Sequence, residues 1–325
     1  MRDLFGNIYE ETPGDGASSK RAPRNRTITL SERERETFLS RCLRPHAALS
    51  EAEVENTTVF ADLFAVTAFL PEGCADLLFV DPPYNMKKRF ASQNFSPTGD
   101  EEYEEYIESW FKPLLKTLKP TASVYVCSDW RSSAAVYRVL NRYTIVRNRI
   151  TWEREKGRGA RHNWKNSSED IWFATVSGDY HFDVEAVKIR RSVIAPYRNT
   201  DGSPKDWVEN KKGKYRLTHP SNLWTDITVP YWSMPENTDH PTQKPEKLLA
   251  KIILASTRRG DLIFDPFVGS GTTSVTAKKL GRRYLGVERE DEYAALTEKR
   301  LELSSQRPEI QGYRGGEFLH RNARL

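Results

Sequence analysis

The segment DPPYN, residues 81–85, follows an apolar run and carries groups that could act on a planar ring bearing an amine. Its two consecutive prolines, Pro82 and Pro83, remove two backbone N–H donors and stiffen the turn. Asp81 and the carbonyl of Pro82 can therefore point at one spot as acceptors, with the flat face of Tyr84 beside them. Accepting both N–H bonds of an amine makes its nitrogen more nucleophilic, and Asp81 can also take up the proton that is lost. The simpler interpretation is a Pro-Pro turn with a capping aspartate.

A glycine-rich segment, DLIFDPFVGSGTT at residues 261–273, has the order apolar strand, acidic residue, glycine loop and helix start. Gly269 and Gly271 would let the backbone pass close to a ligand at the helix N-terminus. Glu288 ends the next apolar run, 19 positions after Gly269, close to the roughly 20 expected for a carboxylate that binds ribose hydroxyls. The missing third glycine disfavours a nicotinamide dinucleotide, and the missing G-K-[ST] excludes a P-loop. The pattern predicts a nucleoside-type cofactor, with a plain tight turn as the alternative.

Strand-like apolar runs recur along the chain, and both motifs follow such runs. The runs are residues 56–62, 75–81, 123–129, 170–176, 261–267 and 282–288. Helical patterns at 101–118 and 245–257 lie between several of them. Strands that alternate with helices predict a mostly parallel sheet with both faces covered. Ligands of such sheets bind beyond the carboxyl ends of the strands, which is where both motifs fall.

Basic residues gather in two segments outside this alternation. Residues 186–220 contain nine basic and three acidic residues, a balance of 9 − 3 = +6, and residues 147–165 contain seven basic and two acidic, or +5. We interpret the loop-like stretch 186–235 as an inserted recognition region, and the Gly-punctuated basic loop at 147–165 as a segment that contacts phosphates. The candidate DNA-binding residues are Lys87, Lys88, Arg158, Arg161, Arg190, Arg191, Arg198 and Lys205.

Aromatic residues are interleaved with these charges. They are Trp152, Trp164, Trp207, Trp224, Tyr231 and Trp232. For any one of them the alternative is an ordinary core residue beneath a solvated charged surface, but the clusters taken together favour nucleic acid. Residues 86–100 are polar and form either a lid over cofactor and base or a plain surface loop.

Composition bounds the remaining possibilities. The chain has 325 residues and a formal net charge of +5, which is compatible with nucleic acid. It has no stretch of 18 uncharged apolar residues and no apolar N-terminal region, so we expect neither a membrane span nor a secretory signal. The three cysteines lie far apart without a C-x-x-C, so we expect no disulfide framework, no structural zinc and a cytoplasmic location. The six histidines show no ligand spacing, and no metal is expected.

Three motifs together resemble a known family. DPPYN at 81–85, HPTQKP at 240–245 and DPFVGSGTT at 265–273 are similar to signatures of the S-adenosylmethionine-dependent DNA amino-methyltransferases, in the motif order of the circularly permuted beta class. The resemblance covers about residues 55–185 and 222–303. It implies an α/β, Rossmann-like methyltransferase fold. Its mostly parallel seven-stranded sheet would end in an antiparallel hairpin and carry helices on both faces.

We divide the chain around the inserted recognition region. The expected segments are a partly disordered N-terminal extension at 1–50, the catalytic half of the methyltransferase domain at 51–185, the target-recognition region at 186–235, the cofactor-binding half at 236–305 and a C-terminal tail at 306–325. Within the extension, we expect residues 1–30 to be mobile, and the apolar spacing at 30–43 predicts a helix packed on the main body.

The resemblance assigns the cofactor to the glycine loop and to residues near the ends of neighbouring strands. Phe267, Gly269 and Gly271 would lie against it, Thr272 or Thr273 near its amino-acid end, Glu288 on its ribose, Asp62 near its adenine and Lys244 on its carboxylate, with Asp265 and Asp81 completing the set. The catalytic residues would be Asp81, Pro82, Pro83 and Tyr84. An exposed loop aspartate is the alternative for Asp62. A turn at a helix start is the alternative for residues 240–245.

The implied activity is transfer of a methyl group from S-adenosylmethionine to N6 of an adenine flipped out of double-stranded DNA. An aspartate at position 81 favours adenine, because relatives that act on N4 of cytosine more often carry serine there. Cytosine-N4 methylation stays the first alternative, followed by a non-catalytic DNA-binding protein that kept the fold. A nicotinamide oxidoreductase would have no use for the 81–84 turn. A homodimer and a cognate restriction endonuclease are open expectations about partners.

Overall fold

The structure of the protein is a computed structural model. It describes residues 22–85, 88–90, 93–95, 98–154, 162–194, 196–210 and 213–320. Three candidate DNA-binding residues, Lys87, Arg158 and Arg161, lie outside the described residues. Lys88 begins the short strand β3 (Lys88–Phe90), which pairs with β4 (Gln93–Phe95) inside the segment expected to be a polar loop.

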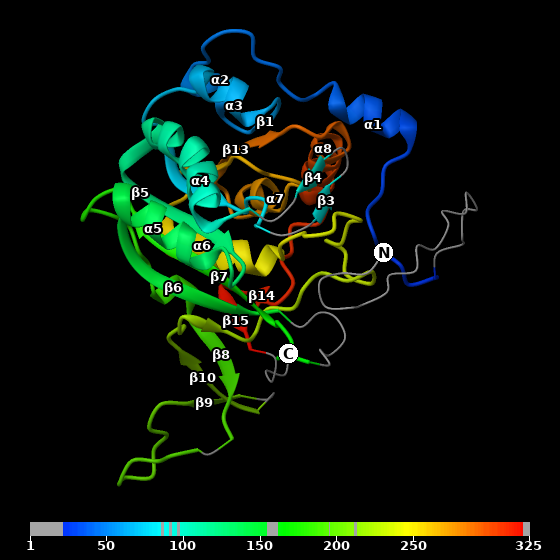
Figure 1. The fold of residues 1–325 in the computed structure, drawn as a ribbon. Helices are drawn as coiled ribbons and strands as arrows, with labels where there is room; N and C mark the ends of the chain where they lie inside the picture. The colour runs from blue at the N-terminus through cyan, green and yellow to red at the C-terminus, as the bar shows by residue number, and fades with distance from the viewer. Residues whose placement is uncertain are drawn as a thin grey trace.

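An eight-stranded sheet forms the centre of the molecule (Figure 1). Its strands, in spatial order, are β1 (Thr57–Phe60), β13 (Arg283–Glu288), β12 (Leu262–Asp265), β2 (Ala75–Val80), β5 (Leu118–Ser128), β7 (Ser168–Thr175), β6 (Ile145–Glu153) and β11 (Leu223–Trp224). Neighbouring strands are parallel except where β7 pairs with β5 and β6. The expected mostly parallel sheet with one antiparallel hairpin is confirmed. The two-residue strand β11 adds an eighth member to the seven expected strands.

Strand β6 corrects one expectation from the sequence. Its residues 147–153 belong to the segment expected to be a basic loop, and that expectation is wrong for them. Ile150 and Trp152 are buried, whereas Arg149 is exposed, which is the alternation of a strand with one face on the core. The basic residues on the outer positions hid this alternation, because the apolar positions are few.

Helices cover both faces of the sheet. Because successive side chains of a strand point to opposite faces, a strand can pack against a different set of helices on each face. In β2, Leu78 and Val80 belong to the cluster that contains α4, whereas Leu77 and Phe79 belong to the cluster that contains α6 and α7. The helices of the described residues are α1 (Glu32–Leu39), α2 (Glu51–Val54), α3 (Leu63–Val66), α4 (Asp100–Leu114), α5 (Ser133–Tyr143), α6 (Glu246–Ser256), α7 (Thr272–Lys279) and α8 (Asp291–Gln306), with 3-10 turns η1 (Thr67–Phe69), η2 (Leu115–Thr117) and η3 (Glu185–Val187). In this part of the chain, no helix is long and apolar enough to cross a membrane.

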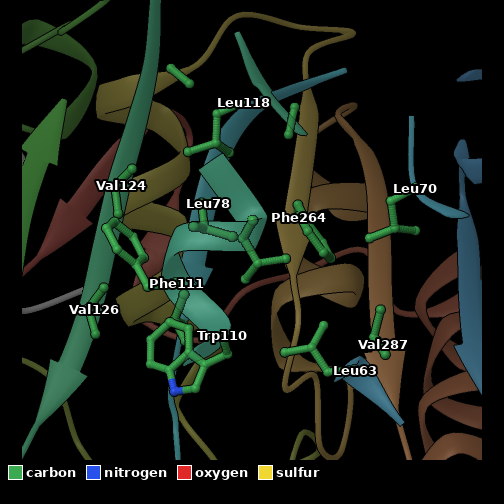
Figure 2. Packing of buried hydrophobic residues seen from close by; sticks show 14 of the residues in the cluster. Leu63, Leu70, Leu78, Trp110, Phe111, Leu118, Val124, Val126, Phe264 and Val287 are labelled. Carbon is green, nitrogen blue, oxygen red and sulfur yellow. The ribbon is translucent and has the colours of Figure 1, made fainter. Parts of the chain in front are cut away.

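Helix α4 supports the glycine loop as well as the sheet. Its buried face carries Trp110, Phe111 and Leu114, which belong to the same apolar cluster as Val124 on β5 (Figure 2). The Trp110 ring also meets Phe267 edge-on, with the ring centroids 5.6 Å apart. The position of Phe267 after β12 is therefore fixed partly by the apolar core beneath it.

A second, five-stranded sheet contains much of the expected recognition region. Its order is β14 (Tyr313–Arg314), β15 (Glu317–Leu319), β8 (Ile189–Ser192), β10 (Gly213–Thr218) and β9 (Val208–Asn210). The expectation that 186–235 is loop-like is therefore wrong for β8, β9 and β10. Figure 1 shows these three strands at the end of the molecule far from α1. Strand β15 pairs in parallel with β8, so residues of the expected C-terminal tail share a sheet with the expected recognition region.

The N-terminal extension is built into the main body from residue 22 onward. Helix α1 packs on α8, as expected, and Arg35 forms an ion pair with Asp291 there. The N–H of Arg26 donates to the carbonyl of Trp232 at 2.7 Å, and the N–H of Ile28 donates to the carbonyl of Asn237 at 2.8 Å. The extension therefore holds the segment that leads into the HPTQKP motif.

Candidate active site

The carboxyl ends of β1, β13, β12 and β2 lie side by side, because these four strands are adjacent and parallel. Each of them ends at or just before an acidic residue, in order Asp62, Glu288, Asp265 and Asp81. A cavity of about 300 Å³ opens at this edge, and all four of these residues line it. The remaining candidates in its lining are Pro82, Pro83, Tyr84, Lys244, Phe267, Gly269, Thr272 and Thr273.

Gly271 is the one candidate cofactor residue that does not line the cavity. Its φ is +81°, a conformation that disfavours any side chain, and its N–H donates to the carbonyl of Val268 at 2.9 Å. A Cβ at this position would lie 2.7 Å from the side chain of Thr297 on α8. Gly271 therefore closes the turn and lets α8 approach from behind, while Gly269 faces the cavity.

Asp265 ties the glycine loop to the helix that follows. Its Oδ2 accepts a hydrogen bond from the Thr273 hydroxyl at 2.5 Å, and its Oδ1 accepts one from the N–H of Phe267 at 3.0 Å. Burial raises the pKa of Asp265 to about 7, although both hydrogen bonds favour the charged form. This carboxyl group fixes the course of the backbone at the cavity floor.

Glu288 is held in one orientation by backbone donors. Its Oε2 accepts from the N–H of Gly269 at 2.9 Å, and its Oε1 accepts from the N–H groups of Arg289 and Glu290 at 2.9 and 2.8 Å. Burial raises its pKa to about 7. Asp62 instead caps helix α3 through the N–H of Phe64, and part of its carboxylate is exposed. The two carboxyl groups thus differ in rigidity and in access to solvent.

The side chains of Asp81 and Tyr84, in the DPPY turn at the end of β2, contact each other and Lys244. The Tyr84 hydroxyl donates to Oδ1 of Asp81 at 2.8 Å, and Nζ of Lys244 donates to Oδ2 of Asp81 at 2.5 Å. Lys244 also lies 3.3 Å from the Tyr84 oxygen and 3.3 Å from Oε2 of Glu169. The expected partner of Lys244 was the cofactor carboxylate. In this structure its ammonium group lies against the catalytic turn, and its contact with the cofactor carboxylate stays a prediction.

Burial and charge shape the titration of these groups. Burial by itself would lower the pKa of Lys244, but the carboxylates of Asp81 and Glu169 outweigh it and raise that pKa. Burial, reinforced by the charge of Asp81, raises the pKa of the Tyr84 hydroxyl well above its ordinary value. Lys244 is therefore cationic and Tyr84 neutral at physiological pH, so both act toward Asp81 as donors.

Glu169 is a site residue that sequence reasoning missed. It lies at the start of β7, where register pairs it with Trp152 of β6 and pairs the next residue, Asp170, with Ser128 at the end of β5. Because β7 is antiparallel, its beginning reaches the edge where the other strands end. Its side chain is 3% exposed and forms ion pairs with Lys244 and Arg154. A charged residue at the start of a predicted strand was the only available signal.

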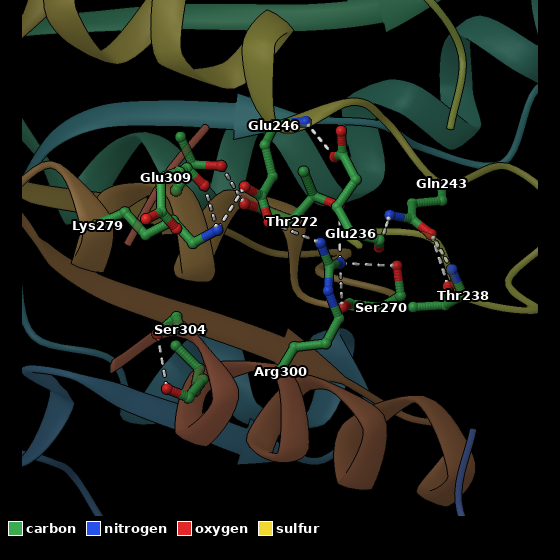
Figure 3. A network of polar contacts seen from close by, with 12 residues as sticks. Glu236, Thr238, Gln243, Glu246, Ser270, Thr272, Lys279, Arg300, Ser304 and Glu309 are labelled. Carbon is green, nitrogen blue, oxygen red and sulfur yellow. Dashed lines mark hydrogen bonds and ion pairs between the residues drawn. The ribbon is translucent and has the colours of Figure 1, made fainter. Parts of the chain in front are cut away.

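Arg300 of α8 was also missed, and it supports the glycine loop from behind (Figure 3). Its Nη1 donates to the carbonyl of Ser270 at 2.7 Å and to the Thr272 hydroxyl at 3.0 Å. Its Nη2 lies 3.3 Å from Oε1 of Glu246. Burial and, to a smaller extent, the negative charge of Glu246 raise the pKa of the neighbouring Glu236 to about 8. This buried network joins α8, the glycine loop and the start of α6.

The arrangement can now be compared with known proteins. Residues 75–299 match the family model of N6 and N4 methyltransferases, described as DNA methylase. The chain belongs to this DNA methylase family.

Two curated relatives span most of the methylase. The type II methyltransferase M2.DpnII of Streptococcus pneumoniae is 32% identical over 76% of this chain and 90% of its own length. The DNA adenine methyltransferase YhdJ of Escherichia coli K12 is 29% identical over 77% of this chain and 83% of its own length.

Solved structures share the fold. The cytosine-N4-specific PvuII DNA methyltransferase aligns with a TM-score of 0.55 at 18% identity, over 86% of this chain and 98% of that chain. A putative DNA modification methylase of Thermus thermophilus, complexed with S-adenosylmethionine, aligns with a TM-score of 0.52 at 19% identity, over 82% of this chain and 99% of that chain. The methylase thus has the Rossmann-like fold of these proteins. The circular permutation stays a prediction.

The cavity of the methylase has the lining that a cationic nucleoside cofactor requires. Apolar surface comes from Leu63, Phe64 and Phe267, which suits a base, and the carboxyl groups of Asp62 and Glu288 suit ribose hydroxyls. The acidic side chains around the cavity also favour a positively charged ligand. A Cβ at Gly269 would lie 3.0 Å from the His240 ring, so the glycine keeps this part of the cavity open.

Two of the candidate DNA-binding arginines, Arg190 and Arg191, lie on the second sheet of the methylase, and Arg198 lies in the segment between β8 and β9. Arg190 on β8 forms an ion pair with Glu317 at 3.0 Å and lies over the Tyr215 ring. Arg191 follows it on the same strand, and Arg198 lies over the Trp207 ring, with 5.1 Å to the centroid. Lys205 is exposed in the loop before β9. These residues lie in one region of the protein, but the ion pair between Arg190 and Glu317 already neutralises part of the positive charge there.

The interleaved aromatic residues divide into two groups. Trp152, Trp207 and Trp224 are buried, so the core interpretation holds for these three. The indole of Trp152 donates to the carbonyl of Ile227, and that of Trp224 donates to the carbonyl of Ser221. The exposed residues are Trp164, Tyr231 and Trp232.

Proposed function

We propose that this methylase transfers a methyl group from S-adenosylmethionine to N6 of an adenine that is flipped out of double-stranded DNA. The observation that carries the proposal is the shared cavity of the DPPY turn and the glycine loop. They meet because β2 and β12 are adjacent and parallel, so their carboxyl ends open at the same place. A base placed on Tyr84 would therefore face a cofactor held by the loop after β12.

The cofactor half of the cavity would hold S-adenosylmethionine through the residues after β12 and β13. When bound, this cofactor supplies an electrophilic methyl carbon attached to a sulfonium. Glu288 would accept hydrogen bonds from the ribose hydroxyls of the cofactor. Phe267 would pack against the cofactor's adenine, with Trp110 behind the Phe267 ring. Thr272 and Thr273, in the first turn of α7, would lie near the amino-acid end.

The catalytic half would act through acceptors. Asp81 and the carbonyl of Pro82 would accept the two N–H groups of the target amine, which makes its nitrogen more nucleophilic. The ring of Tyr84 would stack on the flipped base, and its hydroxyl contact with Asp81 holds the two side chains together. Asp81 would then take up the proton that the amine loses, directly or through water.

The choice of adenine rests on two observations. Position 81 is an aspartate, and YhdJ, one of the curated relatives, is named a DNA adenine methyltransferase. Cytosine-N4 transfer would use the same cavity and the same acceptors. The acceptors of the site support an exocyclic amine as the target class, and the relative favours adenine within it.

The DNA contacts and the partners are part of the same proposal. Cationic residues on and next to the second sheet, among them Arg191 on β8 and Lys205 in the loop before β9, would contact the phosphate backbone and orient the duplex. The curated relatives named type II methyltransferases support a companion restriction endonuclease. A homodimer would be seen directly as a doubled mass in sedimentation analysis, and a monomer would exclude it.

Replacing Asp81 by alanine tests the catalytic assignment. Asp81→Ala should abolish incorporation of tritium from labelled S-adenosylmethionine into DNA, because the acceptor for the target amine is gone. Binding of the same duplex in a gel-shift assay should remain, since Asp81 faces the cavity and not the second sheet. A variant that still methylates DNA at the wild-type rate would contradict the assignment. Loss of both activities would point to a role in folding.

A further inference from the structure

Four charged side chains form a continuous chain beside the catalytic turn. In order they are Arg154, Glu169, Lys244 and Asp81, and each forms an ion pair with the next. The side chains of Glu169 and Lys244 are 3% and 6% exposed, and that of Asp81 is 16% exposed. Two carboxylates and two cations make the group neutral as a whole, as buried charges require.

Lys244 is shared unequally between its two carboxylate partners. Its Nζ lies 2.5 Å from Oδ2 of Asp81 and 3.3 Å from Oε2 of Glu169. The other oxygen of Asp81 already accepts the Tyr84 hydroxyl. Both oxygens of Asp81 therefore have partners within the protein, and an incoming amine has to compete with Lys244 for Oδ2.

We propose that Glu169 is a positioning residue for methyl transfer, because it draws the Lys244 ammonium away from the Asp81 oxygen that must accept the target amine. This inference rests on the proposed function. Glu169 itself touches neither substrate nor cofactor in it. With Glu169 present, Lys244 has an alternative anion 3.3 Å away, so Asp81 can exchange one partner for another without stranding a buried charge.

Loss of the Glu169 charge would change this balance in one direction. Of the two carboxylates that form ion pairs with Lys244 in the described residues, only Asp81 would keep its charge, so the attraction of Lys244 would fall on Asp81 alone. Asp81 would be held in a tighter ion pair and would accept the amine less readily. In the proposed function, Glu288, Phe267, Thr272 and Thr273 hold the cofactor and the cationic residues around the second sheet hold the duplex, so the effect of Glu169 should fall mainly on the transfer step.

Glu169→Gln is the variant that tests this inference, and Glu104→Gln is the matched control. Glu104 is also a buried glutamate that forms ion pairs with two arginines, Arg138 and Arg142, and it does not line the cavity. Single-turnover methylation would be measured with tritiated S-adenosylmethionine, excess protein and unmethylated PCR-amplified DNA of mixed sequence. Cofactor affinity would be measured by calorimetry, duplex affinity by fluorescence anisotropy and folding by thermal unfolding.

We expect the transfer rate constant of Glu169→Gln to fall by about 10- to 100-fold, since misplacing a reacting group by about 1 Å can cost about 100-fold. Cofactor and duplex affinities should stay within about twofold of wild type, as should the transfer rate constant and both affinities of Glu104→Gln. Glu169→Asp keeps the charge on a shorter side chain and should give an intermediate rate. It also serves as the test if the glutamine variant does not fold.

Two results would overturn the inference while the proposed function stands. One is a wild-type protein that methylates DNA together with a Glu169→Gln variant of equal transfer rate. The other is a loss of rate that only follows losses in folding, cofactor affinity or duplex affinity, which would mean a structural role. A wild-type protein that transfers no methyl group would refute the inference and the proposed function together.

Discussion

Replacing Gly271 by alanine should lower the free energy of unfolding through two separate costs. The backbone at this position has a φ of +81°, and an L-residue in the left-handed region costs about 1–2 kcal/mol. The new Cβ would lie 2.7 Å from Cγ2 and Oγ1 of Thr297, and overpacking of this kind costs about 1–3 kcal/mol. The sum is about 2–5 kcal/mol. Cofactor affinity should fall as well, because Gly269 and Thr272 on either side line the cavity.

Gly73→Ala separates the two costs. Gly73 has a φ of +59°, and a Cβ there would meet nothing within 4 Å, so only the backbone cost of about 1–2 kcal/mol applies. Both variants would be unfolded in urea and followed by circular dichroism. The double variant Gly271→Ala/Thr297→Ala should be more stable than the sum of the two single changes predicts, because they share a contact. Equal losses for Gly271→Ala and Gly73→Ala, with strictly additive double-variant energies, would refute the proposed contact with α8.

Two further predictions concern buried charges near the cavity. Arg300→Met should destabilise the protein by about 3–5 kcal/mol in urea unfolding, because it removes the donors to Ser270 and Thr272 and leaves Glu246 with one cation fewer; a change below about 1 kcal/mol would contradict this. Burial raises the pKa of Glu288 to about 7, so this carboxyl is largely protonated at pH 6 and ionised at pH 8. S-adenosylmethionine affinity measured by calorimetry should therefore rise by about tenfold between these values in wild type. The rise should be smaller in Glu288→Gln, where Asp265, whose pKa burial raises to about 7, is left to titrate, and a wild-type affinity that falls with pH would refute the ribose assignment.

The sheet and the cavity could be predicted because their signals are local. Continuous apolar runs identified the buried strands, and the acidic residues at their ends marked the edge where ligands bind. Once the strands are known to be parallel and adjacent, Asp62, Asp81, Asp265 and Glu288 must gather at one edge. Packing then confirmed that they border one cavity. The chemical roles of these four residues stay predictions.

The features that the sequence did not reveal depend on contacts between segments that lie far apart in the chain. Glu169 reaches the catalytic edge because β7 runs antiparallel, and nothing around residue 169 reveals strand direction. Arg300 supports the glycine loop from a helix 30 residues further along the chain. The second sheet pairs β8 with β15 across more than a hundred residues, and its short strands carry so many charges that the sequence looks like a loop. In each case the local pattern was weak and the partner was far away.

Mass spectrometry of nucleosides tests the central claim most directly. Unmethylated DNA of mixed sequence would be incubated with the protein and S-adenosylmethionine, then digested to nucleosides, with Asp81→Ala as the matched control. The account predicts N6-methyladenine from the wild-type protein and none from the variant. N4-methylcytosine would overturn the choice of base while keeping the cavity and its acceptors. The absence of both products, with the cofactor still bound, would contradict the proposed function.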